Sequence, residues 1–198
     1  YGGPGKPDVL MVSDLPLRGG PRLPTNQMAD AIAFVLRERG FRAGRYTVGY
    51  QSCDDSTAQT GIFDLAKCTA NAKAFAATPA VVGVIGPYNS DCAAEEIPVA
   101  NTARAGPLAM ISPTSSLAGL TRPGPFAPKA ALRALYPTGE RNYTRLFPTD
   151  ADQGAADAVL AQGLGARRAF VVSDHGYGEP MAYYFRKAAA RIGLRIVG

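Results

Sequence analysis

Two short loops in this chain combine hydroxyl side chains with the start of a helix. One is Gly86-Pro87-Tyr88-Asn89-Ser90, and the other is Ser112-Pro113-Thr114-Ser115-Ser116. Each follows a predicted buried strand, so hydroxyl groups and unpaired backbone N–H groups gather at the positive end of a helix dipole. Such a loop can hold a carboxylate or a phosphate. The alternative is that these Ser and Thr residues only cap their helices.

Residue types that could perform catalysis do not occur in a productive arrangement. Ser173, Asp174 and His175 are consecutive, and adjacent loop residues point in different directions, which is not the geometry of a catalytic triad. The sequence also lacks a Gly-x-Ser-x-Gly nucleophile elbow, a phosphate-binding loop and a dinucleotide fingerprint. We therefore expect a protein that is not an enzyme, with no catalytic residue and no cofactor.

The three cysteines, Cys53, Cys68 and Cys92, match no zinc-binding pattern. There is no Cys-x-x-Cys pair, and the single histidine, His175, is distant in sequence, so no metal site is predicted. Cys68 falls on a helix pattern typical of a buried thiol, whereas Cys53 and Cys92 each follow a strand pattern at a loop. Free thiols and a disulfide are both open, and the odd count leaves at least one thiol unpaired. We expect one disulfide that includes Cys53.

Composition and charge exclude several classes of protein. The 198 residues are 46% hydrophobic and 19% charged, which is too apolar and too evenly mixed for intrinsic disorder. No apolar run approaches the roughly 18 to 20 residues of a membrane span. The net charge is +5, but the 16 Arg and 5 Lys are scattered singly or in pairs. Without a basic stripe or a reader motif, no nucleic-acid partner is predicted.

Strand and helix patterns alternate along the whole chain. Short apolar runs predict strands at residues 8–13, 46–50, 81–86, 107–112, 142–147, 169–173 and 194–197. Helices are predicted from Thr25 or Asn26 to Gly40, over 62–72, from 89–91 with an interruption near Pro98, over 152–163, and over 181–192. Residues 113–138 are predicted as a long loop. This order predicts an α/β fold with a parallel sheet flanked by helices, which binds ligands beyond the carboxyl ends of its strands.

The order of four motifs resembles the type I periplasmic solute-binding proteins of ABC transporters, of the branched-chain amino-acid-binding kind. The motifs are Val84-Ile85-Gly86-Pro87-x-x-Ser90, Pro107 to Pro113 with its Ser/Thr cluster, Arg145 to Gly154, and Val171-Val172-Ser173-Asp174-x-x-Tyr177-Gly178. The resemblance covers nearly the whole chain from Asp8. It implies a two-lobed clamshell that binds a small molecule between its lobes and closes by hinge motion.

The resemblance also implies roles for individual residues. Ser90, Thr114, Ser115 and Ser116 stand where the family holds the α-carboxylate of the ligand, and Tyr177 where the second lobe covers it. In some members a Cys after the second strand bridges to the loop after the third. Cys53 matches the first of these positions, whereas Cys92 lies a few residues beyond the second and Cys68 is additional.

Domain boundaries follow from the same resemblance: a linker at 1–7, a ligand-binding first lobe at 8–147, and the incomplete start of a second lobe at 148–198. The family's second lobe continues further, so we expect a fragment. The expected function is an extracytoplasmic receptor for an amino acid or related carboxylate, with the membrane permease of an ABC importer as partner. The alternative is a ligand-sensing domain fused to an effector in a larger signalling or transcription-regulatory protein, which could be cytoplasmic.

Overall fold

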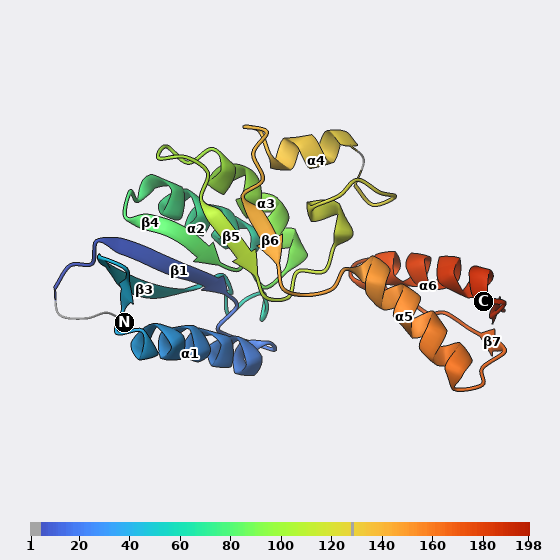
Figure 1. Cartoon of the computed structure of the whole chain (residues 1–198). Coiled ribbons are helices and arrows are strands. Elements are labelled where there is room, and N and C mark those ends of the chain that lie inside the picture. Colours follow the sequence, from blue (N-terminus) through green and yellow to red (C-terminus); the bar gives the residue numbers. More distant parts are fainter. Residues whose placement is uncertain (1–4, 128) are drawn as a thin grey trace. The chain divides into compact units, whose positions relative to one another are not determined.

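A parallel-dominated sheet lies at the centre of residues 9–145 (Figure 1). The computed structural model describes residues 5–127 and 129–198. Six strands lie in the order β2 (Arg42–Ala43), β3 (Tyr46–Asp54), β1 (Val9–Leu15), β4 (Val81–Ile85), β5 (Ala109–Ser112) and β6 (Tyr143–Arg145). Only β2 is antiparallel to its neighbour. The predicted α/β class is therefore confirmed.

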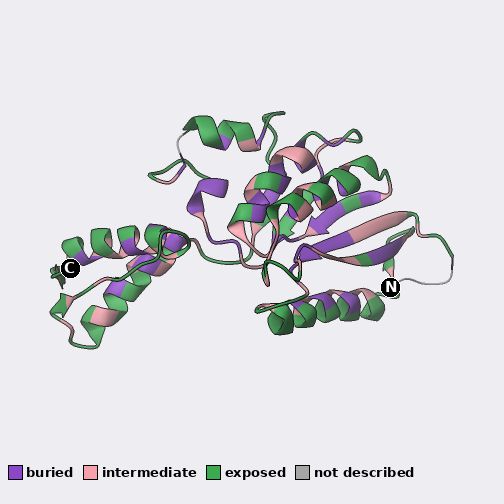
Figure 2. Ribbon diagram, turned by 180° about the vertical axis from the view of Figure 1, so that it is seen from behind, coloured by how far each residue is buried: buried purple, intermediate pink, exposed green. Residues whose placement is uncertain are grey.

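Helices cover both faces of this sheet. α1 (Arg22–Glu38) lies on one face, and α2 (Leu65–Ala77) and α3 (Ser90–Asn101) lie on the other (Figure 1). Figure 2 shows that burial is concentrated in the strands and the inward faces of the helices. Strands and helices share this core. The strands contribute Val12, Leu15, Val84 and Met110 among others, and α3 contributes Ile97.

The order in which successive strands join the sheet reverses at β1. It first moves from β1 outward to β3 and then crosses back to place β4 on the other side of β1. Ligands of open α/β sheets bind at such a switch point, beyond the carboxyl ends of the strands. The loops that follow β1, β4 and β5 therefore stand at the edge where a ligand is expected.

The start of α1 differs from the prediction. The helix begins at Arg22 after Pro21, so Thr25 and Asn26 lie inside it. The buried Thr25 hydroxyl donates to the Pro16 carbonyl at 2.7 Å, and Asn26 Nδ2 donates to that of Leu17 at 3.1 Å. These polar side chains bond to backbone carbonyl groups of the preceding loop. Residue types that make such local bonds to the backbone are also the ones that cap helices, so the sequence pattern resembled a cap.

The long loop predicted at 113–138 is only partly a loop. A 3₁₀ turn forms at Ala118–Leu120, and α4 spans Lys129–Leu135 and buries Leu132. The prolines around this segment concealed the helix-forming run Lys129-Ala130-Ala131-Leu132. Two later strands are shorter than predicted: β7 is Arg168–Ala169 and β8 is Arg195–Ile196.

The chain divides into two compact units. The first comprises residues up to 115 together with 129–147, and the second comprises 116–128 and 148–198. Residues 116–128 therefore belong to the second unit, whereas the sequence boundaries placed them in the first lobe. Of the predicted linker at 1–7, residues 1–4 lie outside the described residues, and residues 5–7 form no helix or strand.

The second unit is built on two helices, α5 (Asp150–Gly163) and α6 (Gly178–Ile192). Its small core consists of Ala158, Ala189 and Leu194 with the apolar side chains around them, and a two-stranded parallel sheet of β7 and β8 adjoins it. Thr149 caps α5 through a reciprocal hydrogen-bonding box with Asp152. The helices approach closely at Gly154, where an added Cβ would lie 2.5 Å from the Met181 carbonyl oxygen.

The helices in the described part of the chain are too short or too polar to cross a bilayer.

Candidate functional site

The two loops singled out in the sequence contact each other at the carboxyl edge of the sheet. The loop after β5 donates two hydroxyl hydrogen bonds to the loop after β4. Ser112 Oγ donates to the Pro87 carbonyl at 2.7 Å, and Thr114 Oγ1 donates to the Tyr88 carbonyl at 2.6 Å. The two segments thus form one structure at the start of α3.

Ser112 is the centre of this arrangement. Its side chain is fully buried at the end of β5. Besides donating to Pro87, its Oγ accepts the backbone N–H of Ser115 at 2.9 Å and that of Thr114 at 3.4 Å. Sequence reasoning did not name Ser112 as a site residue, because the last residue of a strand looks like core. Its position directly before the Ser/Thr cluster was the available signal.

The predicted residues Thr114 and Ser115 serve the loops themselves. Thr114 donates to Tyr88, and the buried Ser115 hydroxyl makes longer bonds to the carbonyls of Pro87 and Tyr88 at 3.4 and 3.5 Å. A hydroxyl has one hydrogen to donate, and these carbonyls take it. Both hydroxyl groups therefore hold the two loops together, and their contact with a ligand stays a prediction.

The start of α3 provides those donors. Asn89 precedes the helix with extended backbone and makes no side-chain capping bond, and Ser90, which is half-buried, is the first helical residue. The first N–H groups of a helix have no partner within it, and the helix dipole places partial positive charge there. Asn89 Oδ1 is buried without a hydrogen-bond partner among the described residues. A polar group that is buried without a partner is costly unless a ligand or water pairs with it.

A positive charge also reaches this edge. Arg145 ends β6, and its Nη1 donates to the Ser115 carbonyl at 3.2 Å. The guanidinium carbon lies 5.9 Å from the ring centre of Tyr143. Arg145 was part of the motif that carried the family resemblance, but it was not named as a site residue. Its guanidinium adds an attractive charge for an anion at the same edge.

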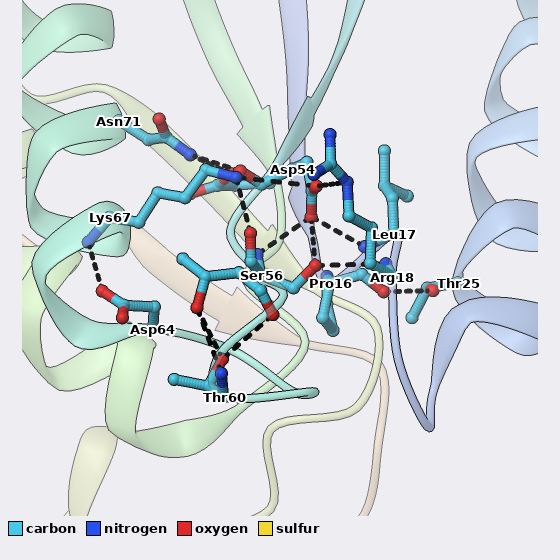
Figure 3. Close-up of polar contacts among 12 residues, drawn as sticks. Pro16, Leu17, Arg18, Thr25, Asp54, Ser56, Thr60, Asp64, Lys67 and Asn71 are labelled. Carbon is cyan, nitrogen blue, oxygen red and sulfur yellow. Dashed lines mark hydrogen bonds and ion pairs between the residues drawn. The ribbon is translucent and has the colours of Figure 1, made fainter.

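Asp54 ties the loops that follow β1 and β3 (Figure 3). Its Oδ1 accepts the N–H groups of Leu17 at 3.0 Å and Ser56 at 2.9 Å, and its Oδ2 lies 3.1 Å from Arg18 Nε and 3.5 Å from Lys67 Nζ. Burial alone would raise the pKa of Asp54, but the hydrogen bonds from Ser56 and Leu17 and the charge of Lys67 together lower it. The ionised carboxylate therefore holds two neighbouring loops of the edge in place.

Three further carboxyl groups are buried behind these loops: Asp14 near the end of β1, Asp55 after β3, and Glu96 inside α3. Burial raises the pKa of Asp14 to about 7 and that of Asp55 to about 8. Burial, together with the charge of Asp14, raises the pKa of Glu96 well above its usual value. These groups tend to retain protons near neutrality, unlike ordinary surface carboxyls.

The cysteine prediction was wrong. Cys68 of α2 and Cys92 of α3 form the disulfide, with their Cα atoms 5.6 Å apart, and Cys53 is a free thiol. β3 extends to Asp54, so Cys53 lies within the strand opposite Asp14 and not in a loop. α2 and α3 pack against the same face, which brings their two cysteines together. Burial raises the pKa of the Cys53 thiol to about 11, so this thiol is unreactive near neutral pH.

The other two predicted residues lie in the second unit. Ser116 is buried, and its carbonyl accepts the N–H of Asp150 at 2.9 Å. Tyr177 directly precedes α6 and is 57% exposed. Their contact with a ligand stays a prediction.

The consecutive Ser173, Asp174 and His175 form no triad. Asp174 Oδ1 accepts the N–H of Gly178 at 2.6 Å and that of Gly176 at 3.2 Å. This carboxylate therefore satisfies backbone groups at the start of α6. An open hollow nearby is lined by Phe126, Ser173, Glu179, Tyr183, Arg186 and Lys187, and none of the five predicted binding residues lines it.

Comparison with known proteins identifies the family. The model of the receptor family ligand-binding region matches residues 31–198. No curated protein matches the chain in sequence. Solved structures with a similar fold include an ABC transporter substrate-binding protein from Desulfitobacterium hafniense, with 21% identity, a TM-score of 0.72, and coverage of 96% of this chain and 49% of that one.

Two further solved structures concern different small molecules, leucine and 4-hydroxybenzoate. A leucine-binding protein, LivK, from Thermotoga maritima is 21% identical with a TM-score of 0.72, and the match covers 95% of this chain and 47% of that one. A solute-binding protein from R. palustris in complex with 4-hydroxybenzoate is 19% identical with a TM-score of 0.75, and the match covers 96% and 45%. The chain thus spans about half the length of these solved structures, all of which are type I periplasmic binding proteins. It belongs to the receptor family ligand-binding region, the family of ligand-binding proteins that the motif order had indicated.

Proposed function

We propose that this chain binds the carboxylate of an amino acid or related small acid, as the first lobe of a solute receptor for an ABC importer. The observation that carries the proposal is the pair of hydrogen bonds from Ser112 and Thr114 to Pro87 and Tyr88. These bonds fix two loops around the start of α3, where N–H groups that have no acceptor inside the helix, together with the helix dipole, favour an anion. Arg145 adds a positive charge at the same edge.

The ligand class rests on chemistry shared by the similar structures. The leucine-binding protein and the 4-hydroxybenzoate complex involve different molecules, but leucine and 4-hydroxybenzoate both carry a carboxylate. A site made of backbone N–H groups recognises that group and ignores the rest of the molecule. Ser90, at the first position of α3, is the side chain we expect to contact the carboxylate.

The proposed location is outside the cytoplasm, with a membrane permease as partner. The Cys68–Cys92 disulfide supports an oxidising compartment, since disulfides are uncommon in the reducing cytosol. A second candidate is a sensor domain of a larger signalling protein, which the match to receptor ligand-binding regions favours. Uptake of the bound solute, compared between cells with and without the gene, separates the two candidates. Loss of uptake without the gene supports the importer, and unchanged uptake supports the sensor.

Isothermal calorimetry on the natural full-length protein tests ligand binding. The panel contains neutral amino acids, benzoates and the corresponding amides. We expect at least one carboxylate to bind and its amide to bind about tenfold more weakly or not at all, because a charge-assisted hydrogen bond contributes roughly 1.5–3 kcal/mol. Equal affinity for an acid and its amide would refute the proposal.

Thr114 offers a matched pair of variants for the same measurement. Thr114→Val keeps the shape of the side chain but removes the bond to the Tyr88 carbonyl, whereas Thr114→Ser keeps that bond. A hydrogen bond of this kind contributes about 1 kcal/mol, so Thr114→Val should weaken binding roughly fivefold. Thr114→Ser should bind nearly as the natural protein does. Weaker binding by Thr114→Ser but not by Thr114→Val would show that the methyl group, and not the loop-to-loop bond, matters.

A further inference from the structure

Asp14, Asp55 and Glu96 form a group of buried carboxyls with almost no basic partner. All three are at most 1% exposed. Asp14 Oδ1 accepts a hydrogen bond from Asn71 Nδ2 at 2.7 Å. Asp14 Oδ2 and both side-chain oxygens of Asp55 and Glu96 meet no N–H or hydroxyl donor among the described residues. The carboxyl groups of Asp14 and Glu96 influence each other's pKa, and two such groups buried without a cation between them are not both charged, so the pair holds at least one proton.

The charged and titratable groups around Asp14 do not neutralise it. Asp14 interacts electrostatically with Asp54 and Cys53 of β3 and with Asp55 in the following loop. It also interacts with Lys67 of α2, and Glu96 interacts with Tyr143 of β6. Lys67 is the cation of this set, and its ammonium is engaged by the Ser56 carbonyl at 2.6 Å and by Asp54 at 3.5 Å. A buried negative charge on Asp14 would therefore have no cation of its own, which is costly. Binding a proton removes that cost.

The carboxyl pair adjoins the loop that forms the proposed ligand site. Gly86 packs directly on the backbone of Asp14, because an added Cβ would lie only 2.4 Å from the Asp14 carbonyl oxygen. Glu96 lies six residues after Ser90 in α3, which is about 9 Å along the helix axis. A bound carboxylate at Ser90 and a negative charge on the pair would repel each other over about 10 Å, which corresponds to about a tenfold loss of affinity in a protein-like dielectric.

We propose that Asp14, paired with Glu96, is a positioning residue for the ligand site: the pair must hold its protons for an anionic ligand to bind tightly at the start of α3. This inference rests on the proposed function. Ligand affinity then falls as pH rises and Asp14 ionises, and ligand binding above neutral pH takes up a proton. Because the two carboxyl groups are coupled, the pH at which the pair loses a proton is a property of both residues together.

Three variants separate this role from a merely structural one. Asp14→Asn keeps an acceptor for Asn71 and stays neutral, so its affinity should be high and independent of pH. Glu96→Gln gives Asp14 a permanent N–H donor, which favours the ionised form, so its affinity should be low and nearly independent of pH. Glu95→Gln removes a charge from an exposed neighbouring position on the same helix, and it should behave as the natural protein does.

The experiment is calorimetric titration of the full-length protein with benzoate and with leucine from about pH 6 to about pH 9, in buffers of different ionisation enthalpy. Benzoate has no amine, so its charge is constant over this range. We expect about a tenfold loss of affinity toward alkaline pH and fractional proton uptake near neutrality, both absent in Asp14→Asn. Infrared spectra should show the carbonyl band of a protonated carboxylic acid that Asp14→Asn diminishes, and melting curves identify any variant that fails to fold.

The outcomes are distinct. Binding that is equally tight at every pH, or a pH dependence that persists in Asp14→Asn, would overturn this inference and leave the proposed function standing. Failure of every carboxylate to bind at any pH would overturn both.

Discussion

Replacing Asp55 with Asn should change how the stability of the first unit depends on pH. Asp55 is fully buried, and neither of its side-chain oxygens has a hydrogen-bond partner among the described residues. Burial, reinforced by the charges of Asp14 and Asp54, raises its pKa from 3.8 to about 8. The folded protein therefore binds a proton at Asp55 that the unfolded chain releases above about pH 4.

The sign of the effect follows from this difference. Because the folded pKa is the higher one, the stabilising contribution of the protonated group is complete below about pH 4 and is lost as pH rises toward about 8. One such group lowers the free energy of unfolding by about 1.4 kcal/mol for each pH unit. Between about pH 5 and pH 7 the loss amounts to as much as about 2.7 kcal/mol from Asp55.

Urea unfolding followed by circular dichroism at several pH values measures this slope. Asp55→Asn cannot ionise, so its free energy of unfolding should fall less steeply between about pH 5 and pH 7, by up to the same 2.7 kcal/mol. The control is Asp30→Asn, which alters an exposed carboxyl on α1 and should leave the slope unchanged. Parallel pH profiles for the natural protein and Asp55→Asn would refute the assignment of a buried, protonated Asp55.

Three other changes test the packing described above. Breaking the disulfide by Cys68→Ala with Cys92→Ala should lower the free energy of unfolding by about 3.5 kcal/mol, from the loop-closure entropy expected for a sequence separation of 24. Thiol titration of these 198 residues, unfolded without a reductant, should find one free thiol, that of Cys53. Ser112→Ala should cost about 1–3 kcal/mol in urea unfolding, because the Ser115 N–H loses its partner and the Pro87 carbonyl keeps only the longer bond from Ser115. A neutral effect would contradict the central place of Ser112. Gly154→Ala should lower the melting temperature by forcing α5 and α6 apart, whereas Gly163→Ala, with nothing within 4 Å, should not.

Much of the fold could be predicted because it depends on patterns that are local in sequence. Val81 to Ile85 is an uninterrupted apolar run, and such a run forms a buried parallel strand wherever helices cover both faces of the sheet. The alternation of strands and helices then fixed the carboxyl edge as the place to look for a ligand. Ser90, Thr114 and Ser115 do lie at that edge.

The remaining features depend on contacts between residues that are distant in sequence. Cys68 bonds with Cys92 because α2 and α3 pack side by side, and neither residue carries a local sign of its partner. Thr25 resembles a helix cap, but its hydroxyl is directed to the Pro16 carbonyl. Asp14 and Glu96 are far apart in sequence, so the structure was needed to reveal that their carboxyl groups influence each other's pKa.

The measurement that tests the central claim most directly is a map of backbone amide chemical shifts in the full-length protein as a carboxylate ligand is added. If the start of α3 holds the carboxylate, the amide protons of Ser90 and Asp91 should move furthest, because a new hydrogen bond to an anion forms there. Ala100, at the far end of the same helix, should move little. Saturating ligand that leaves Ser90 and Asp91 unshifted would contradict the account.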